Sequence, residues 1–425
     1  MTNNEKTVYV YENWISDEPH LMGKLYSSFI RGEENFAFEY DLNWIKEFNF
    51  DQTIDPDLTF MRGRQYTSDG KTLFGIFVDS CPDRWGRVLM NRKEEFIAKK
   101  ENRKPRKLSE IDYLLGVNDK SRMGALRFSL EKNGEFVSND EEFSTPPWVN
   151  LRELEQTSIN YENDNNESDK WIKQLVAPGS SLGGARPKAN VIAPDGSLWI
   201  AKFPSKYDEL NAGCWEKVAN DLAKMCELDV PESKIESFSK YGSTFLVKRF
   251  DRENNKRIHF ASAMTLLGKK DGVSSHDDVS YLDLVDFIRS FSCNPDRDLK
   301  ELWKRVAFNI AISNTDDHLR NHGFILCNNG WMLSPVYDIN PTPWGNNLSL
   351  NIDENSSELN FDLLMSVSFL YGLDDNYAKT TIKHICEIVC NNWENTARQY
   401  HIPNSEIERM KPAFIKAQEF YSFNK

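Results

Sequence analysis

One stretch of the sequence, residues 312–341, constrains the fold of this 425-residue chain more than any other. Two short apolar runs in it flank Asn329-Gly330, a dipeptide suited to a two-residue turn with positive φ. The two runs are therefore expected to pair as a hairpin. A hairpin returns the chain to its start, so Asp338, just past the second strand, is expected to come back towards Asn321, just before the first.

The spacing of the polar residues around this hairpin is typical of a phosphoryl-transfer loop. Asp316 and Asn321 are separated by four residues, the D-x-x-x-x-N spacing of a kinase catalytic loop. In such a loop the Asp accepts the proton of the attacking hydroxyl group and the Asn holds a magnesium ion. Asp338 stands where a second metal-binding Asp is expected, so Asn321 and Asp338 are candidate ligands of Mg²⁺ on ATP. The alternative interpretation is a polar turn followed by a surface hairpin.

The composition limits the class of protein. It is 40% hydrophobic and 28% charged, which is typical of a soluble globular protein, and no apolar run approaches membrane-spanning length. The N-terminus lacks a signal-peptide pattern. The formal net charge of −13 argues against nucleic-acid binding by the whole surface, because phosphate contacts need a basic face. Seven cysteines without a C-x-x-C pattern indicate free thiols, so a cytoplasmic protein is expected.

A second group of candidate site residues forms a loop of small residues upstream of the hairpin. Gly183, Gly184 and Ala185 allow backbone N–H groups to approach phosphates, and Arg186 and Lys188 add positive charge. The loop matches neither a Walker A motif nor G-x-G-x-x-G. A flexible loop without a ligand is therefore the alternative interpretation.

A predicted hairpin follows, with residues 189–193 and 198–203 as strands. Its second strand ends at Lys202 in Trp-Ile-Ala-Lys, similar to the V-A-I-K strand whose Lys holds the α- and β-phosphates of ATP. A helix is predicted over residues 208–227, with Glu216 on a narrow face of small residues. Two interpretations of Glu216 are open: it is buried as the partner of Lys202, or it is exposed on the surface.

The remaining elements connect these candidate sites. A strand over residues 244–247 is predicted to run into Lys248 and Phe250, at a crossing between two lobes where backbone groups can bind adenine. The rest of the chain is expected to be mostly helical. Amphipathic helices are predicted over residues 281–291, 299–311 and 378–393, and the second of them leads directly to Asp316.

Taken together and in this order, these motifs resemble the HipA family, bacterial serine/threonine kinases of type II toxin–antitoxin modules. The likeness extends over nearly the whole chain. It rests on Phe38-Glu39-Tyr40-Asp41, Pro82-Asp83-Arg84-Trp85-Gly86-Arg87, Arg122-Met123-Gly124-Ala125-Leu126-Arg127-Phe128, Ser181-Leu182-Gly183-Gly184-Ala185-Arg186-Pro187-Lys188, Arg249-Phe250-Asp251-Arg252, Asp316-x-His318-x-Arg320-Asn321 and Pro335-x-Tyr337-Asp338-Ile339.

The resemblance implies an α+β, two-lobed protein-kinase-like fold of the HipA type. It implies an extra β-rich N-terminal subdomain over residues 1–145, an ATP-binding lobe with the glycine-rich loop over residues 146–250, and a helical lobe over residues 251–425. Asp316 would be the catalytic base, with Asn321 and Asp338 as magnesium ligands. The residues implied to bind ATP are Gly183, Gly184, Ala185, Arg186, Lys188, Lys202, Lys248, Phe250, His318, Asn321 and Asp338.

Ser181 stands where the family has a regulatory autophosphorylated serine, and its neighbour Ser180 is the alternative. A phosphate of about −2 charge cannot stay where the ATP phosphates bind, so its addition would move the loop. Two residues depart from the best-known member. Pro187 replaces an acidic residue, and Lys248 replaces a glutamate at the crossing between the lobes.

The function implied by the resemblance is ATP-dependent phosphorylation of a cellular protein. The implied partner is a HipB-like DNA-binding antitoxin, with DNA contacted only through it and no contact with a membrane. Known substrates of the family include aminoacyl-tRNA synthetases, but no residue in this chain selects one.

Two alternatives come from other classes. The chain would be a co-repressor that binds the antitoxin without catalysis, or a metal hydrolase that uses Asp317, His318, His322 and Cys327. In the latter, His318-x-x-x-His322 would have the spacing of zinc ligands on a helix.

Overall fold

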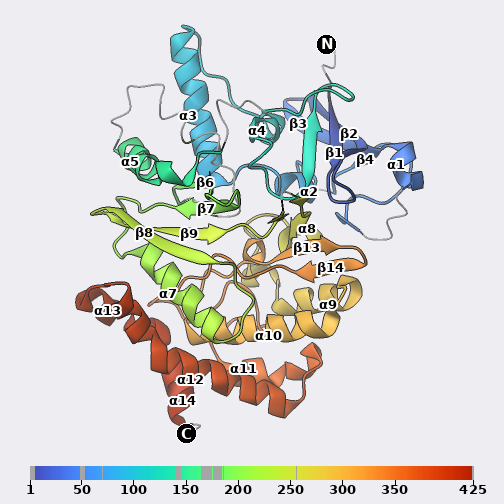
Figure 1. Cartoon of the computed structure of the whole chain (residues 1–425). Coiled ribbons are helices and arrows are strands. Elements are labelled where there is room, and N and C mark those ends of the chain that lie inside the picture. Colours follow the sequence, from blue (N-terminus) through green and yellow to red (C-terminus); the bar gives the residue numbers. More distant parts are fainter. Residues whose placement is uncertain are drawn as a thin grey trace. The chain divides into compact units, whose positions relative to one another are not determined.

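The computed structural model describes residues 5–47, 53–68, 70–138, 145–163, 175, 184, 186–254 and 256–423. The chain forms two compact units, whose helices and strands are labelled in Figure 1. Unit 1 comprises Met1–Phe203 and Lys248–Lys270, and unit 2 comprises Pro204–Val247 and Asp271–Lys425. Within the described ranges no helix is long and apolar enough to span a lipid bilayer. The division into three domains stays a prediction.

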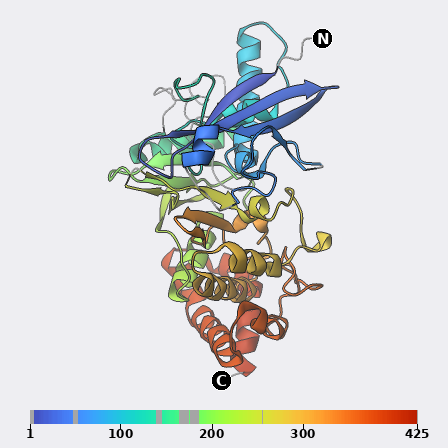
Figure 2. The same cartoon turned by 90° about the vertical axis from the view of Figure 1, so that its right-hand side faces the viewer.

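Unit 1 begins with a five-stranded antiparallel sheet in the order β4-β3-β2-β1-β5, whose blue strands are seen in Figure 2. Its strands are β1 (Lys6–Glu12), β2 (His20–Ile30), β3 (Glu33–Tyr40), β4 (Gln65–Tyr66) and β5 (Leu126–Ser129). Alternate apolar residues face one side, where Phe38 lies 5.5 Å from Phe77 between ring centroids. The sheet agrees with the β-rich N-terminal part that the family resemblance implied.

The other elements of unit 1 are short, apart from two helices. They are α1 (Leu42–Glu47), α2 (Gly75–Val78), α3 (Arg84–Lys100), α4 (Glu110–Gly116), α5 (Leu151–Glu162), β6 (Lys188–Ile192), β7 (Leu198–Lys202), β10 (Arg252–Glu253), β11 (Lys256–Arg257), β12 (Phe260–Ser262) and α8 (Ala263–Leu266).

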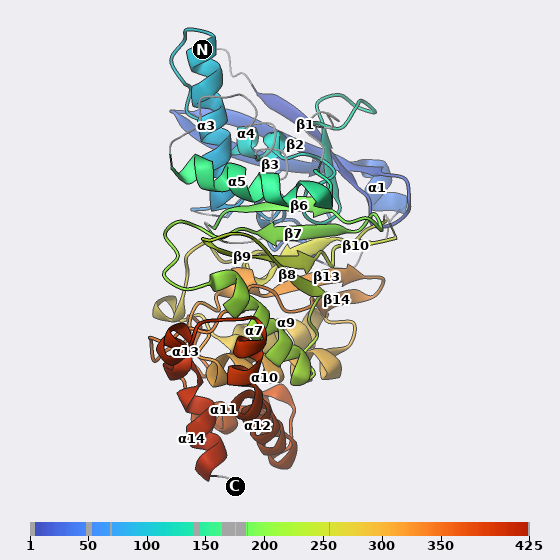
Figure 3. The ribbon, with the colours of Figure 1, turned by 60° about the vertical axis from the view of Figure 1, so that its left-hand side comes forward.

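The β6–β7 hairpin forms as predicted, with Lys188 opposite Lys202. Gly196 takes a φ of 84° in the turn, and the backbone N–H of Ala193 donates to Ser197 O at 2.9 Å. Helix α5 lies over β6, as Figure 3 shows. The chain before α5 is joined to β6, because the Ile192 N–H donates to Pro146 O at 2.9 Å.

The N-terminus of α3 is fixed to β6 by two side chains. Asp83 caps the helix, accepting from Gly86 N–H at 2.8 Å, and its other oxygen lies 2.8 Å from Lys188 Nζ. Both members of this ion pair are almost fully buried, with side chains 1% and 2% exposed. Trp85 Nε1 donates to Lys188 O at 3.1 Å. Lys188 is therefore the first residue of a strand and a buried anchor of unit 1.

A second buried ion cluster in unit 1 is centred on Asp251. Its carboxylate accepts from Arg249 Nε at 2.8 Å and Nη2 at 2.6 Å, from Arg252 Nη1 at 2.6 Å, and from Gly124 N–H at 2.8 Å. Burial alone would raise the pKa of Asp251, but the two guanidinium groups outweigh burial and hold this pKa well below its usual range. The cluster joins the segment after β9 to the loop before β5.

Unit 2 is mostly helical, and its red C-terminal helices pack against one another (Figures 1 and 3). Its elements are α7 (Ala212–Met225), β8 (Ser233–Ser239), β9 (Gly242–Lys248), α9 (Tyr281–Phe291), α10 (Pro295–Ala311), β13 (Gly323–Cys327), β14 (Gly330–Leu333), α11 (Phe361–Ser366), α12 (Asp375–Gln399), α13 (Asn404–Met410) and α14 (Ile415–Phe423). Helix α12 packs against α7, α10, α11 and α14.

The predicted helices of unit 2 are present, with some different ends. Helix α10 begins earlier than predicted, because Asn294 caps it and Pro295 occupies the first turn. Helix α7 begins later, after the cap residue Asn211. Glu216 on α7 is 5% exposed, so the interpretation that placed it on the surface is wrong. Its pairing with Lys202 stays a prediction.

The Asp251 cluster predicts a stability effect with a defined pH dependence. Replacing Asp251→Asn leaves Arg249 and Arg252 buried without a countercharge, and is expected to cost about 3–5 kcal/mol at pH 7. Because the pKa of Asp251 is lowered by folding, its contribution is complete above about pH 5 and shrinks as the pH falls below the unfolded pKa of about 3.9.

The measurement is the unfolding midpoint of both proteins between pH 7 and pH 3. The control is Glu5→Gln at the exposed pair with Arg64, whose side chains are 33% and 39% exposed, and whose loss is expected to cost less than about 1 kcal/mol. An Asp251→Asn protein as stable as this control at pH 7 would contradict the argument.

Candidate active site

The loop of unit 2 that carries Asp316 is built on its buried neighbour, Asp317. One oxygen of Asp317, Oδ2, accepts from Tyr281 Oη at 2.6 Å and Asn309 Nδ2 at 2.7 Å, and lies 2.8 Å from His322 Nε2. Burial would raise the pKa of Asp317, but the His322 ring and these hydrogen bonds hold it below its usual range. A single carboxylate oxygen therefore joins α9, α10 and the two ends of the loop.

Asp316 is exposed, whereas Asn321 lies beneath it and is 6% exposed. The Asn321 amide nitrogen donates to the backbone oxygen of Asp316 at 2.9 Å. This bond fixes the amide plane, and in the described part of the chain Asn321 Oδ1 is buried with no hydrogen-bond partner. A buried carboxamide oxygen without a donor is costly, and oxygen is the ligand atom that Mg²⁺ prefers. Asn321 therefore fits the role of a magnesium ligand.

The predicted hairpin after Asn321 is present as β13 and β14, with one difference in register. Cys327 pairs with Gly330, so the two turn residues are Asn328 and Asn329, one position earlier than predicted. Gly330 has a φ of 151°, and a Cβ added there would lie 2.6 Å from the backbone oxygen of Phe291. Glycine is therefore required by the close packing of β14 on the end of α9, and the turn itself does not require it.

The hairpin brings the segment with Asp338 back to Asn321. Tyr337 Oη donates to the backbone oxygen of Arg320 at 2.7 Å. Asn321, Tyr337 and Ile339 also line one small cavity of about 10 Å³. Asp338 itself is half-buried and has a φ of 59°, a left-handed conformation that is strained for a non-glycine residue. Joint binding of Mg²⁺ by Asn321 and Asp338 stays a prediction.

The candidate ATP-binding residues of the first half of the chain fall in and around the β6–β7 hairpin. Lys202 ends β7 and is 9% exposed. Arg186 Nε donates to Phe203 O at 3.1 Å, and Gly184 has a φ of 83°. Lys248 ends β9 and is half-buried. Ser180, Ser181, Gly183 and Ala185 lie outside the described residues.

Two further candidates are placed by neighbouring rings and charges. The Phe250 ring lies 5.9 Å from that of Phe260, so it packs inside unit 1. Lys188 was predicted as a residue of the phosphate-binding loop, but its ammonium group is held in the buried pair with Asp83. An ammonium group has three donors, so a contact of Lys188 with ATP is compatible with that pair and stays a prediction.

The geometry gives no support to the zinc-hydrolase alternative. His318 precedes a 3₁₀ turn over Leu319–Asn321 in an extended conformation, so His318 and His322 do not share a helix face. His322 is used by Asp317. Among the described residues no group of three or more His, Cys, Asp or Glu side chains is arranged to hold a metal ion.

The sequence analysis assigned Asp317 only to the zinc-hydrolase alternative. It missed the contacts of Tyr281 and Asn309 with Asp317. The available signal was Asn309, a polar residue in the apolar stripe of α10 that is 2% exposed. A buried amide on such a stripe indicates a specific hydrogen-bond partner.

Comparison with known proteins places this site in a family. A model of the HipA-like C-terminal domain matches residues 180–393, half of the chain, including every candidate site residue named above. The chain belongs to the HipA-like family. The predicted resemblance is therefore confirmed.

The HipA-like chain has curated relatives at low identity. A protein of Haemophilus influenzae named "Putative kinase" is 28% identical over 195 residues, which are 40% of this chain and 56% of that protein. The serine/threonine-protein kinase toxin HipA of Shewanella oneidensis is 27% identical over 190 residues, 38% of this chain and 43% of that protein. The matched region spans about half the length of these curated relatives.

A solved structure shows the same fold over nearly the whole length. It is described as the complex of HipA, HipB and operator DNA of the Shewanella oneidensis toxin–antitoxin system. The matching chain has a TM-score of 0.67 and 17% identity, and the match covers 97% of both chains. The predicted α+β fold of the HipA type is therefore confirmed.

The packing of Gly330 predicts that a methyl group there is destabilising. Gly330→Ala is expected to cost about 1–3 kcal/mol more than Gly372→Ala, because Gly372 also has a positive φ, of 72°, but has no atom within 4 Å of an added Cβ. The φ of 151° at Gly330 is also less accessible to a residue with a Cβ than the left-handed helical φ of Gly372, so backbone strain adds to the difference. Urea unfolding of the two proteins measures the difference, and equal losses of stability would show that the contact with Phe291 is relaxed at no cost.

Asp317 and the three side chains bonded to its Oδ2, those of Tyr281, Asn309 and His322, are called the Asp317 hub below. This hub predicts a graded loss of stability. Asp317→Asn removes the charge and one acceptor from three buried neighbours, and is expected to lower the free energy of unfolding by about 1–3 kcal/mol. Tyr281→Phe removes a single donor and is expected to cost less. Urea unfolding followed by Trp303 and Trp331 fluorescence checks the order, since both tryptophans are buried in unit 2. A Tyr281→Phe protein less stable than Asp317→Asn would contradict the assignment of Asp317 as the hub.

Proposed function

We propose that this protein transfers the γ-phosphate of ATP to a serine or threonine hydroxyl group of a cellular protein. One observation carries the proposal: Asn321 bonds the backbone of Asp316 through its nitrogen. Its buried oxygen has no donor among the described residues and lies beside the segment with Asp338. This is the arrangement expected of a metal ligand next to a catalytic base. Membership of the HipA-like family and the kinase names of the relatives support it.

Each group in the loop has a defined role in the proposed reaction. The substrate oxygen forms a bond to the γ-phosphorus, the bond from that phosphorus to the β–γ bridging oxygen breaks, and ADP leaves. The exposed carboxylate of Asp316 accepts the proton of the attacking hydroxyl group. Magnesium, held by Asn321 Oδ1 and the Asp338 carboxylate, would supply positive charge to the phosphate oxygens.

The Asp317 hub contributes positioning. Because its three neighbours are already bonded before a substrate arrives, the loop does not have to be reordered during the reaction, and Asp316 is held at a fixed place. Asp317 is thus a positioning residue, and Asp316 is the proposed catalytic residue.

For ATP binding, we assign Lys202 to the phosphates and the backbone of Lys248 and Phe250 to adenine. Gly183, Gly184, Ala185 and Arg186 would line the phosphate side, His318 would lie beside it, and Ser181 would accept a regulatory phosphate. Lys188 would turn its remaining donors to the phosphates, while its pair with Asp83 anchors the strand after the loop.

A HipB-like DNA-binding antitoxin is the proposed partner. The support is the fold shared with the HipA chain whose solved complex contains HipB and operator DNA. Contact with DNA through that partner agrees with the net charge of −13 on this chain. The protein would then act as the toxin of a toxin–antitoxin pair.

The proposal predicts that two carboxylates are essential for phosphate transfer. Asp316→Asn and Asp338→Asn are expected to lower transfer by at least about 10²-fold while the unfolding midpoint stays within a few degrees of wild type. The matched control is Glu354→Gln, an exposed acid of the same unit, which is expected to transfer at the wild-type rate.

Purified proteins would be incubated with magnesium and radioactive ATP, alone and with a cell lysate, and the added phosphate measured by intact mass and by labelling. Labelling by a folded Asp316→Asn protein at the wild-type rate would refute the assignment of the base. A wild-type protein that labels neither itself nor any lysate protein would instead favour the co-repressor without catalysis.

A further inference from the structure

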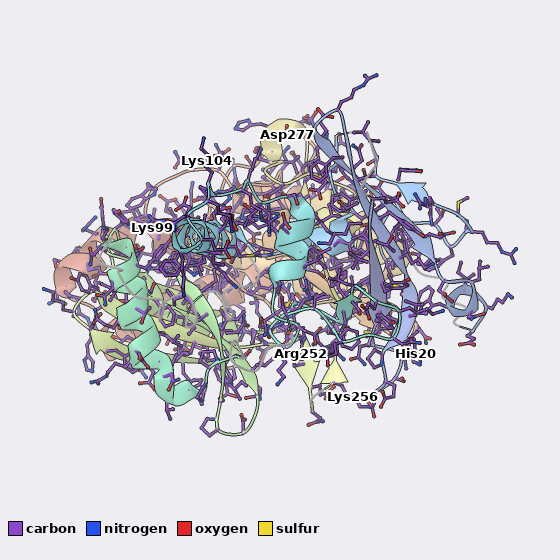
Figure 4. The ribbon with its side chains drawn as sticks, turned by 90° about the horizontal axis from the view of Figure 1, so that it is seen from above. His20, Lys99, Lys104, Arg252, Lys256 and Asp277 are labelled. Carbon is purple, nitrogen blue, oxygen red and sulfur yellow. The ribbon has the colours of Figure 1, made fainter. Side chains whose placement is uncertain are left out.

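Unit 1 contains a cavity of about 680 Å³ with a basic wall. The positive side chains that line it are Lys120, Lys248, Arg249, Arg252 and Arg257. They come from the loop before β5, the end of β9 and the β10–β11 hairpin. Figure 4 shows Arg252 and Lys256 together on that hairpin, far from Lys99 and Lys104 of the basic stretch around the end of α3. Neither Gly184 nor Lys202 lines the cavity, so it is separate from the proposed phosphate side of the ATP site.

The charges around this cavity are not balanced by the carboxylates beneath it. Asp251 is shared by Arg249 and Arg252, and Asp119 is shared by Arg127 at 2.6 Å and Arg257 at 3.0 Å. Each carboxylate thus serves two guanidinium groups. With Asp195 and Glu253, Lys120 and Lys248 included, four carboxylates face six cations among the described residues, and the excess is positive.

A further cation, Arg122, adds to the excess. It is fully buried, and its terminal nitrogens donate to the backbone oxygens of Ser80 at 2.8 Å and Val117 at 2.9 Å rather than to an acid. Burial lowers the pKa of Arg122 to about 10, and burial together with neighbouring guanidinium groups lowers that of Arg252 to about 9. Positive charge in this part of unit 1 is therefore held at a cost that a bound anion would reduce.

Arg257 is the group that points to a ligand. Its side chain is 10% exposed, and its Nη2 donates to the backbone oxygen and the carboxylate of Asp119. Its other terminal nitrogen, Nη1, is buried and has no hydrogen-bond partner among the described residues. Arg257 lines the cavity, and a turn of its guanidinium group would bring Nη1 to an acceptor oxygen there and give this donor its missing partner.

We propose that this cavity binds a compact phosphate-bearing anion, held by the guanidinium group of Arg257 and by the ammonium groups of Lys120 and Lys248. A phosphate group suits this set, because its oxygens accept from several directions at once and guanidinium groups bind them in pairs. Asp195 and Glu253 also line the cavity, and their charge disfavours an extended polyanion such as nucleic acid. The site uses no metal, which distinguishes it from the candidate active site.

The experiment is calorimetric titration of the full chain with pyrophosphate and, separately, inorganic phosphate, both in the presence of EDTA. Saturable binding of pyrophosphate with a stoichiometry of one is expected, with weaker binding of inorganic phosphate, which carries less charge. Lys120→Gln and Arg257→Gln are each expected to weaken binding by at least about tenfold, the effect of losing one charged hydrogen bond.

Lys120 and Lys256 provide the controls. The Lys120 side chain is exposed, so its replacement uncovers no buried charge and remains a valid test if Arg257→Gln fails to fold. Lys256→Gln changes an exposed lysine on the same hairpin that pairs with Asp17 at 3.0 Å and does not line the cavity, so it is expected to bind as wild type does.

Three outcomes would overturn the proposal: no binding of either anion to the wild-type protein, equal binding by Lys120→Gln and wild type, or binding that needs magnesium and disappears in Asp338→Asn. The last result would assign the anion to the candidate active site. The test does not depend on the proposed kinase activity, because an inactive Asp316→Asn protein is expected to bind pyrophosphate normally in EDTA.

Discussion

A single buried oxygen, Oδ2 of Asp317, fixes the loop on which the proposed chemistry of unit 2 depends. An ionised carboxylate is stable inside a protein only where donors surround it, so moving these donors away would leave a buried charge unpaired. The three groups that meet at this oxygen come from α9, from α10 and from the residue after Asn321. The two adjacent acids therefore differ in role: Asp317 is buried and holds the loop, whereas Asp316 is exposed, as the proposed contact with a substrate requires.

Unit 1 follows the same principle with ion pairs. Asp83 joins the start of α3 to β6, and Asp251 joins the segment after β9 to the loop before β5. Both acids lie in motifs that indicated the HipA-like family. A family motif of this kind therefore includes residues that hold distant segments together, in addition to the residues proposed to bind ATP.

The sequence predicted local structure better than it predicted partners. The hairpin after Asn321 followed from two apolar runs around Asn329-Gly330. Its register was one residue off, because Gly330 pairs with Cys327 and packs against Phe291 instead of forming the turn. The sequence did not show that Lys188, predicted as a loop cation, also pairs with Asp83. The burial of Glu216 was one of two interpretations, since its face of small residues was visible in the helical period. In each case the sequence did not show which distant segments contact one another.

The two groups of polar residues suggest opposite ways of handling phosphate. Around Asn321 and Asp338 the protein offers oxygen atoms, which repel an anion until a cation is added. Around Arg257 it offers guanidinium groups in excess over carboxylates, which attract an anion directly. The net charge of −13 makes the second arrangement the exception on this chain, and a local excess of buried positive charge is retained against both desolvation and self-repulsion. Under the two proposals, affinity for phosphate would depend on magnesium at the first site and would not depend on it at the second.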